Sequence, residues 1–161
     1  MDVSGYKLLL ISAKLIKLDF NSWIPYYMPS MKEKTIYTDL SEPGKRLINR
    51  AIGEAYSFKV SEVDTGFIAI ALLDDKALRM RHNLVVDIHS LREVLRDLGG
   101  YPPEQMGAIS FSPAVYDLKE VALAVAQSNG LTLATPESFF SALRDESAVG
   151  IGAVLLRRVL P

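Results

Sequence analysis

Asp87 and His89, near the middle of the chain, have the residue types and spacing best suited to chemistry. They end the run Asn83-Leu-Val-Val-Asp-Ile-His89 and are two positions apart. Residues two apart on a strand project from the same face, so the carboxylate and the imidazole would point the same way. Ser90 and Glu93 have the spacing of a capping box, which predicts that a helix starts at once. A strand that ends in two convergent polar groups and leads into a helix is a common site of catalysis in α/β enzymes.

Other kinds of reactive site have less support in the sequence. His82 is the second histidine, but a separation of seven residues along a strand is roughly 23 Å, too far for a shared metal ion. The sequence has no Gly-x-Ser-x-Gly elbow and no Gly-rich phosphate loop, and it has no cysteine. The simpler interpretation makes His89 a polar residue at the end of a strand and Asp87 a structural partner of an arginine.

Four arginines could contact phosphates. Arg46 and Arg50 are four positions apart, as are Arg92 and Arg96, so each pair would share one face of a helix. Residues 41–100 contain nine basic and nine acidic side chains, however, which also fits a solvated, salt-bridged surface.

An aromatic and proline-rich segment provides a different candidate surface. Residues 23–29 include Trp23, followed by Tyr26 and Tyr27 between two prolines, and the prolines exclude a regular helix. This segment is a loop packed on the core or a surface on which a protein partner or a nucleobase stacks.

Composition limits the class of protein. The 161 residues predict a single domain, and 18 basic against 19 acidic residues give no overall nucleic-acid signature. The absence of cysteine and of a recognisable signal or membrane segment predicts a cytoplasmic protein, and the scarcity of glutamine and cysteine favours a thermophilic source.

Hydrophobic periodicity and turn signals predict alternating strands and helices, and hence a partly parallel mixed sheet flanked by helices. The apolar tail from Ala148 to Pro161 is a final edge strand or an oligomer contact. We predict helices at 41–56, 90–99, 113–129 and 135–144, and strands at 6–20, 58–63, 67–73, 83–89, 106–111 and 131–134.

The order of these elements resembles the PD-(D/E)XK nuclease superfamily, which has the restriction-endonuclease-like fold. The similarity covers residues 41–143 and rests on short phrases within them. These phrases are Ala-Tyr-Ser-Phe-Lys-Val at 55–60, Gly-Phe-Ile-Ala-Ile-Ala-Leu-Leu at 66–73, Val-Val-Asp-Ile-His at 85–89, Gly-Ala-Ile-Ser-Phe-Ser at 107–112 and Gly-Leu-Thr-Leu at 130–133.

The resemblance implies an αβββαβ core and a vestigial active site. Such nucleases bind Mg²⁺ through an Asp on the second strand and a Glu-x-Lys on the third. Here Ile68 occupies the position of the first Asp, while Asp87 and His89 stand where Glu and Lys would be. One carboxylate is a poor ligand set for Mg²⁺, so the site would have lost its activity and the protein would need no cofactor.

We therefore predict a non-catalytic nuclease-like module that acts as a structural or nucleic-acid-associated subunit. Its parts would be residues 1–40, an α/β core at 41–145 and the tail at 146–161. A protein partner or a second copy of the chain is expected, DNA or RNA is possible, and no membrane contact is expected. Two alternatives are an active Mg²⁺-dependent nuclease that uses Asp87 as its metal ligand and a Rossmann-like domain that binds a small ligand.

Overall fold

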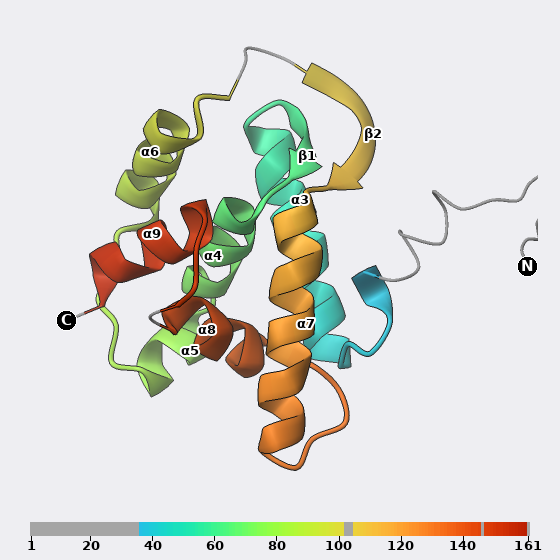
Figure 1. The fold of residues 1–161 in the computed structure, drawn as a ribbon. Helices are drawn as coiled ribbons and strands as arrows, with labels where there is room; N and C mark the ends of the chain where they lie inside the picture. The colour runs from blue at the N-terminus through green and yellow to red at the C-terminus, as the bar shows by residue number, and fades with distance from the viewer. Residues whose placement is uncertain (1–35, 102–104, 146, 161) are drawn as a thin grey trace, which may run out of the picture. The chain divides into compact units, whose positions relative to one another are not determined.

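The computed structural model describes residues 36–101, 105–145 and 147–160, and residues Asp39–Pro161 form one compact unit. The unit is mostly helical, with one short parallel sheet (Figure 1). Its elements are α3 (Glu42–Ser57), β1 (Val60–Val63), α4 (Thr65–Leu73), α5 (Lys76–Arg81), α6 (Ile88–Gly99), β2 (Gln105–Phe111), α7 (Pro113–Ser128), α8 (Pro136–Arg144) and α9 (Ile151–Val159).

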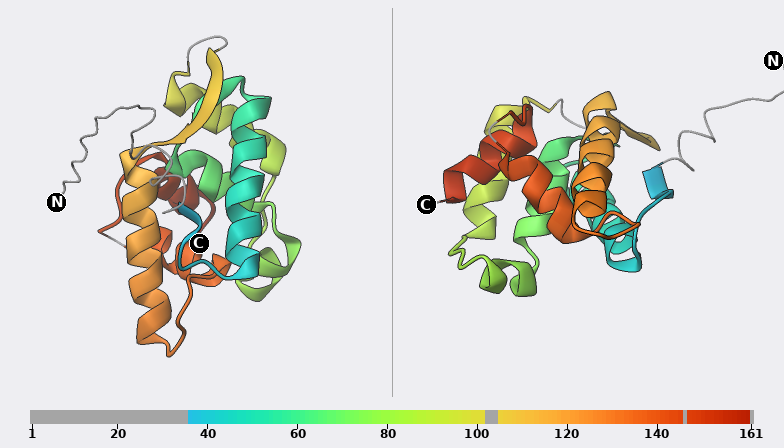
Figure 2. Two further views of the ribbon diagram at one scale, coloured as in Figure 1. Left: turned by 90° about the vertical axis from the view of Figure 1, so that its right-hand side faces the viewer. Right: turned by 60° about the horizontal axis from the view of Figure 1, so that its bottom comes forward.

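The same series of elements occurs twice in this unit. A long helix, a short extended segment and a nine-residue helix follow one another as α3, β1 and α4, and again as α7, residues 131–134 and α8. Helix α7 starts 71 positions after α3 (113 − 42), and α8 starts 71 positions after α4 (136 − 65). In the left view of Figure 2 the two long helices stand on two sides of the shorter ones. The buried residues of the long helices match at the same offset: Gly44, Leu47, Ile48, Ala51 and Ala55 in α3, and Val115, Leu118, Lys119, Ala122 and Ala126 in α7.

The two series are joined by an exchange of extended segments. Val63, which follows α3, pairs with Phe111, which precedes α7. Leu40, which precedes α3, forms a parallel bridge with Ala134, which follows α7. The amide of Ser112 donates to the carbonyl oxygen of Val63, and the amide of Ser41 donates to that of Ala134, both at 2.9 Å. The two joints are therefore related by the same 71-residue offset.

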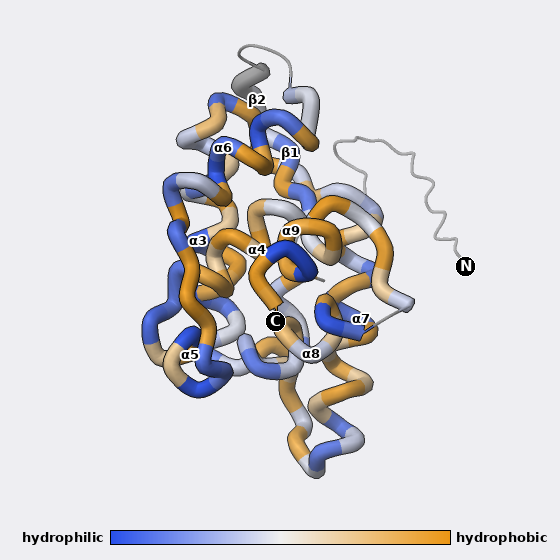
Figure 3. Tube along the Cα trace, turned by 90° about the vertical axis from the view of Figure 1, so that its left-hand side faces the viewer, coloured by the Kyte–Doolittle hydropathy of each residue, from blue (hydrophilic) through white to orange (hydrophobic). Residues whose placement is uncertain are grey.

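Helix α4 forms the centre of the core. All nine of its residues are buried, and its tube is largely orange in the hydropathy view of Figure 3. Its N-terminus is capped by the carboxylate of Asp64, which accepts from the amides of Gly66 and Phe67. At its C-terminus, Arg79 donates to the carbonyl oxygen of Leu73 at 2.6 Å and Arg50 donates to that of Ala71 at 3.3 Å. Side chains thus satisfy backbone groups at both ends of a helix that has little contact with water.

An aromatic cluster supports the cap of α4. The rings of Phe58 and Phe67 pack edge to face, and Tyr101 stacks on Phe67 with its centroid at 5.2 Å. The hydroxyl of Tyr101 donates to Asp64 at 2.6 Å. Burial, together with this bond to a carboxylate, raises the pKa of the Tyr101 hydroxyl, so it stays protonated as a donor.

Helix α9 packs against α4 with an unusually close backbone approach. The amide of Gly152 donates to Oγ1 of Thr65 at 3.0 Å in a buried position. A Cβ atom on Gly152 would overlap the carbonyl group of Thr65 and lie 2.8 Å from its carbon atom. Ala153, Leu155 and Leu156 of α9 are buried beside this contact.

The predicted α/β class and αβββαβ core are wrong, because several apolar segments form helices instead of strands. Residues 67–73 belong to helix α4, and residues 83–87 form a loop before α6. Residues 131–134 contribute only the bridge at Ala134, and the tail forms helix α9 instead of an edge strand. The helix α5 was not predicted.

The other predicted elements in this unit are confirmed within a few residues. They are the helices α3, α6, α7 and α8 and the strands β1 and β2. The predicted strand at 6–20 and the aromatic segment at 23–29 lie outside the described residues.

The approach of α9 to α4 predicts that Gly152→Ala lowers the free energy of unfolding by about 1–3 kcal/mol, because the added methyl group has no space. Urea denaturation measures the change. Gly53→Ala is the matched control: it lies inside α3 with nothing within 4 Å of an added Cβ, and it should stabilise the protein by about 0.5–1 kcal/mol. Equal effects of the two substitutions would contradict the predicted packing.

Candidate functional site

The predicted pair Asp87 and His89 lies at the N-terminus of helix α6 and contributes to its cap. Asp87 is the N-cap of this helix, and its carboxylate accepts from the amides of His89 and Ser90 and, at 2.7 Å, from the hydroxyl of Ser90. These bonds with Ser90 hold the pKa of Asp87 below its usual range. The prediction that Ser90 caps the helix is wrong, because the cap lies three residues earlier.

The structure does not surround Asp87 with further ligands. Among the described residues, no group of three His, Asp or Glu side chains is arranged to hold a metal ion. His89 contributes its amide to the cap, and Ile68, the position expected to face Asp87, is buried within α4. The strand pair on which a nuclease site would be built is absent from this part of the chain.

Three of the four arginines predicted to contact phosphates bind groups within the chain. Arg50 donates to the carbonyl oxygen of Ala71, Arg92 makes a two-point contact with Glu54, and Arg96 binds Glu93. Arg46 is exposed on α3. The residues predicted to contact a partner, Trp23, Tyr26 and Tyr27, lie outside the described residues.

A cluster of titratable groups links α5 to α8. Glu137 accepts from His82 Nε2 and from Arg81 Nε, each at 2.7 Å, and the His82 ring lies 4.2 Å from the ring of Phe140. Desolvation alone would raise the pKa of Glu137, but the bonds from His82 and Arg81 outweigh it and lower the pKa. Each member of the cluster has a partner, so the cluster connects α5 to α8. We call these contacts of Glu137 with Arg81 and His82 the Glu137 tie.

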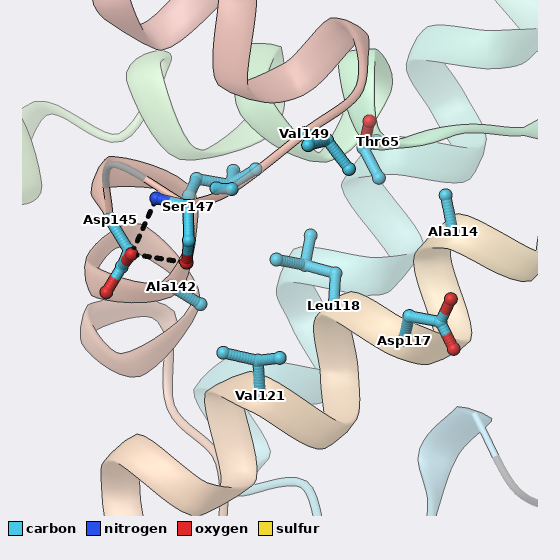
Figure 4. Close-up of a pocket in the computed structure, with 11 residues that line it drawn as sticks. Thr65, Ala114, Asp117, Leu118, Val121, Ala142, Asp145, Ser147 and Val149 are labelled. Atoms are coloured by element: carbon cyan, nitrogen blue, oxygen red, sulfur yellow. Dashed lines mark hydrogen bonds between the residues drawn. The ribbon is translucent and has the colours of Figure 1, made fainter.

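A hollow of about 240 Å³ lies between α7 and the segment that links α8 to α9 (Figure 4). Val121 of α7, 49% exposed, lies at one end of the hollow, and Thr65, at the start of α4, lies near the other. We call this hollow the α7–α8 groove; its lining residues are Thr65, Ala114, Asp117, Leu118, Val121, Ala142, Leu143, Asp145, Ser147, Ala148 and Val149.

The position of Val121 has a counterpart in the first half of the unit. At the 71-residue offset, Val121 corresponds to Arg50 and Ala142 to Ala71. The Arg50 side chain is 43% exposed, and its Nη2 atom lies 3.3 Å from the carbonyl oxygen of Ala71 and 3.8 Å from Asp75. Valine has no hydrogen-bond donor in its side chain, so Val121 cannot make the matching contact with the carbonyl oxygen of Ala142.

The chemistry of the groove suits binding. Its surface is mainly apolar, and the carboxylates of Asp117 and Asp145 lie on opposite sides of it (Figure 4). Ser147 donates its hydroxyl and its amide to Asp145, which lowers the pKa of Asp145 and keeps it ionised. Asp117 makes no hydrogen bond or salt bridge to another described residue. Among the described residues, no Lys, Arg, His or Cys side chain lines the groove.

No local pattern in the sequence marks the groove residues, because their signal is an internal repeat. Leu47, Ala51 and Ala55 recur as Leu118, Ala122 and Ala126 at one offset, a signal of an internal repeat. That comparison would also have shown valine in place of arginine at position 121.

Comparisons with known proteins identify a different family from the one predicted. Residues 39–157 match the family model of the Clp repeat (R) N-terminal domain. The same residues include the whole segment on which the nuclease resemblance rested, so that resemblance and the nuclease-like function drawn from it are wrong. No curated protein matches the chain.

Solved structures with a similar fold agree with that match. The N-terminal domain of the caseinolytic protease associated chaperone ClpD from Arabidopsis thaliana has a TM-score of 0.59 and 18% identity, over 76% of this chain and 87% of that one. The N-terminal domain (1–163) of the ClpV1 ATPase from the E. coli EAEC Sci1 T6SS has a TM-score of 0.58 and 17% identity, over 79% of this chain and 82% of that one. In the described part of our chain, no helix is long and apolar enough to cross a membrane.

The Glu137 tie predicts a pH-dependent contribution to stability. Because the folded pKa lies below the ordinary value of 4.5, the contribution is complete above that value and is lost as pH falls through the folded pKa. Glu137→Gln should therefore cost stability near neutral pH and progressively less in acid. The side chain is 41% exposed, so the cost should be no more than about 1 kcal/mol.

Urea titrations of wild type and Glu137→Gln across acidic pH measure this difference. Glu62→Gln, on an exposed position of β1, is the control. A difference that does not change with pH would exclude the proposed ionic contribution.

The contact of Arg50 with the end of α4 predicts that Arg50→Val lowers the free energy of unfolding by about 1 kcal/mol, because the carbonyl of Ala71 loses a donor. Arg46→Val makes the same chemical change at an exposed position of the same helix, and its effect should stay within about 0.5 kcal/mol. Thermal denaturation of both variants tests this; similar losses would mean that the Arg50 contact has no energetic role.

Proposed function

Because this chain belongs to the Clp repeat (R) N-terminal domain family, we propose that it is a protein-interaction module that docks polypeptides for a Clp-type chaperone ATPase. Two proteins that share its fold are described as a protease-associated chaperone and as an ATPase. This proposal replaces the non-catalytic nuclease-like module predicted from the sequence, and the partners that it names are proteins.

The observation that carries the proposal is the open α7–α8 groove. Its volume of about 240 Å³ is below the roughly 300–1,000 Å³ of sites for small molecules, so it suits one or two side chains of a polypeptide. Its apolar lining is exposed at Val121 and at Val149. Burying such surface favours association, as in protein interfaces generally.

The position of the groove also supports a docking role. Its sides are formed by α7, by the end of α8 and the segment that links α8 to α9, and by the start of the buried helix α4; α7 and α8 pack closely on each other. A surface built on packed helices loses little conformational entropy when a segment binds. The groove is therefore ready to bind without rearrangement.

A second contact for partners remains a prediction from the sequence. Trp23, Tyr26 and Tyr27 have the residue types common in interfaces, and they could extend the docking surface beyond the groove.

Blocking the groove should weaken docking. Val121→Arg places in α7 the residue that α3 carries at the counterpart position, and it should weaken binding of an unfolded protein by about tenfold or more through loss of the apolar contact. Fluorescence anisotropy with labelled, reduced and carboxymethylated α-lactalbumin measures the affinity.

Val85→Arg is the matched control for this experiment. Val85 is 97% exposed in the loop before α6 and does not line the groove, so the same new charge should change the affinity by less than about twofold. Circular dichroism checks that both variants keep the helical fold. Undiminished binding by folded Val121→Arg would refute a docking role for the groove.

A further inference from the structure

We propose that Arg157 of α9 is a positioning residue for docking: it holds one wall of the α7–α8 groove in the shape that receives a polypeptide. This inference rests on the proposed docking function and assigns to α9 the control of the site. Among the described residues, α9 contributes none to the lining of the groove. It is nevertheless hydrogen-bonded to two of the groove's sides.

The wall in question is the turn between α8 and α9. Its described residues Asp145, Ser147 and Ala148 line the groove. The amide of Ser147 donates to Oδ1 of Asp145 at 2.8 Å (Figure 4), and the amide of Ala148 donates to the carbonyl oxygen of Asp145 at 3.0 Å. These bonds give the turn its local shape, but they run within it and do not attach it to α9.

Arg157 makes that attachment. Its Nη2 atom donates to the carbonyl oxygen of Ala148 at 2.6 Å and to the carbonyl oxygen of Asp145 at 3.4 Å. One guanidinium group therefore bonds both the first and the last of the described residues of the turn. The planar head of arginine suits this task, because its donors are fixed relative to one another and little side-chain freedom is lost for each bond.

The second attachment of α9 lies at the start of α4. The amide of Gly152 donates to Oγ1 of Thr65 at 3.0 Å in a buried position, and Thr65 lines the groove. Leu155 and Leu156 of α9 are buried, so the helix is anchored in the core beside this bond. Arg157 thus extends from a fixed support, and its contact sets where the turn stands relative to Thr65.

The turn depends on Arg157 because apolar packing does not fix it. No described residue of 145–149 is buried, and Val149 is 83% exposed. Without the bonds from Arg157, a polypeptide would have to order the turn as it binds. That ordering costs conformational entropy and lowers the affinity.

The test compares Arg157→Gln with Arg158→Gln, which removes the same charge from the next position of the same helix. Arg158 is exposed and makes no hydrogen bond or salt bridge to another described residue. In the anisotropy assay with labelled α-lactalbumin, Arg157→Gln should weaken docking about fivefold, because the shorter side chain cannot reach both carbonyl oxygens. Arg158→Gln should change the affinity by less than about twofold. Arg157→Lys, which keeps the charge without the planar head, should give an intermediate loss.

Amide hydrogen exchange followed by NMR separates positioning from a general loss of stability. In Arg157→Gln the amides of Ser147 and Ala148 should exchange faster, while those of the buried helix α4 should keep the wild-type rate. In the wild type, docked α-lactalbumin should slow exchange at Ser147, at Ala148 and in α9, because coupling between the wall and the bound polypeptide is reciprocal.

The outcomes separate this inference from the proposed function. If Val121→Arg weakens docking and Arg157→Gln does not, the role of Arg157 is overturned and docking in the groove stands. Equal losses in Arg157→Gln and Arg158→Gln, or faster exchange throughout α4, would also overturn it. Unchanged exchange at the turn of the docked wild type would do so even if Arg157→Gln failed to fold. If neither Val121→Arg nor Arg157→Gln weakens docking, both proposals fail.

Discussion

Complete burial of α4 is the constraint on which the rest of this domain depends. A helix with nine buried residues gains apolar contact on every side, but its terminal amides and carbonyls then have little access to water and need partners from the chain. Asp64 supplies them at one end, and Arg50 and Arg79 supply them at the other. These side chains come from the preceding segment, from α3 and from α5, so capping α4 also fixes the elements around it.

The elements with a clear amphipathic pattern were predicted correctly from the sequence. The predicted fold class was wrong. Helices such as α3 and α8 bury one face and begin at Ser41 or Thr135, and both signals are local. Helix α4 has no polar face, so its run of apolar residues is indistinguishable from a central strand by periodicity alone. The apolar run before Asp87 also fits a strand, and with both runs as strands the predicted order of elements resembles a nuclease.

The candidate site could not be predicted from local patterns at all. Asp87 attracted attention because a carboxylate after an apolar run is typical of active sites, yet the same residue type is the preferred N-cap of a helix. Val121 carries no signal of its own, since an exposed valine on a helix is ordinary. Only a comparison of the two halves shows that Val121 stands where the first half has Arg50.

The two halves of the unit pair at Val63–Phe111 and at Leu40–Ala134. In each pairing, the segment after the long helix of one half contacts the segment before the long helix of the other, so the joint is self-complementary. Two identical halves could pair through the same two contacts about a two-fold axis, as subunits do in an isologous dimer. The domain is in this sense a homodimer whose subunits have been fused into one chain. Neither Arg50 nor Val121 lies in the joint, so the two halves differ at this position while the joint is kept.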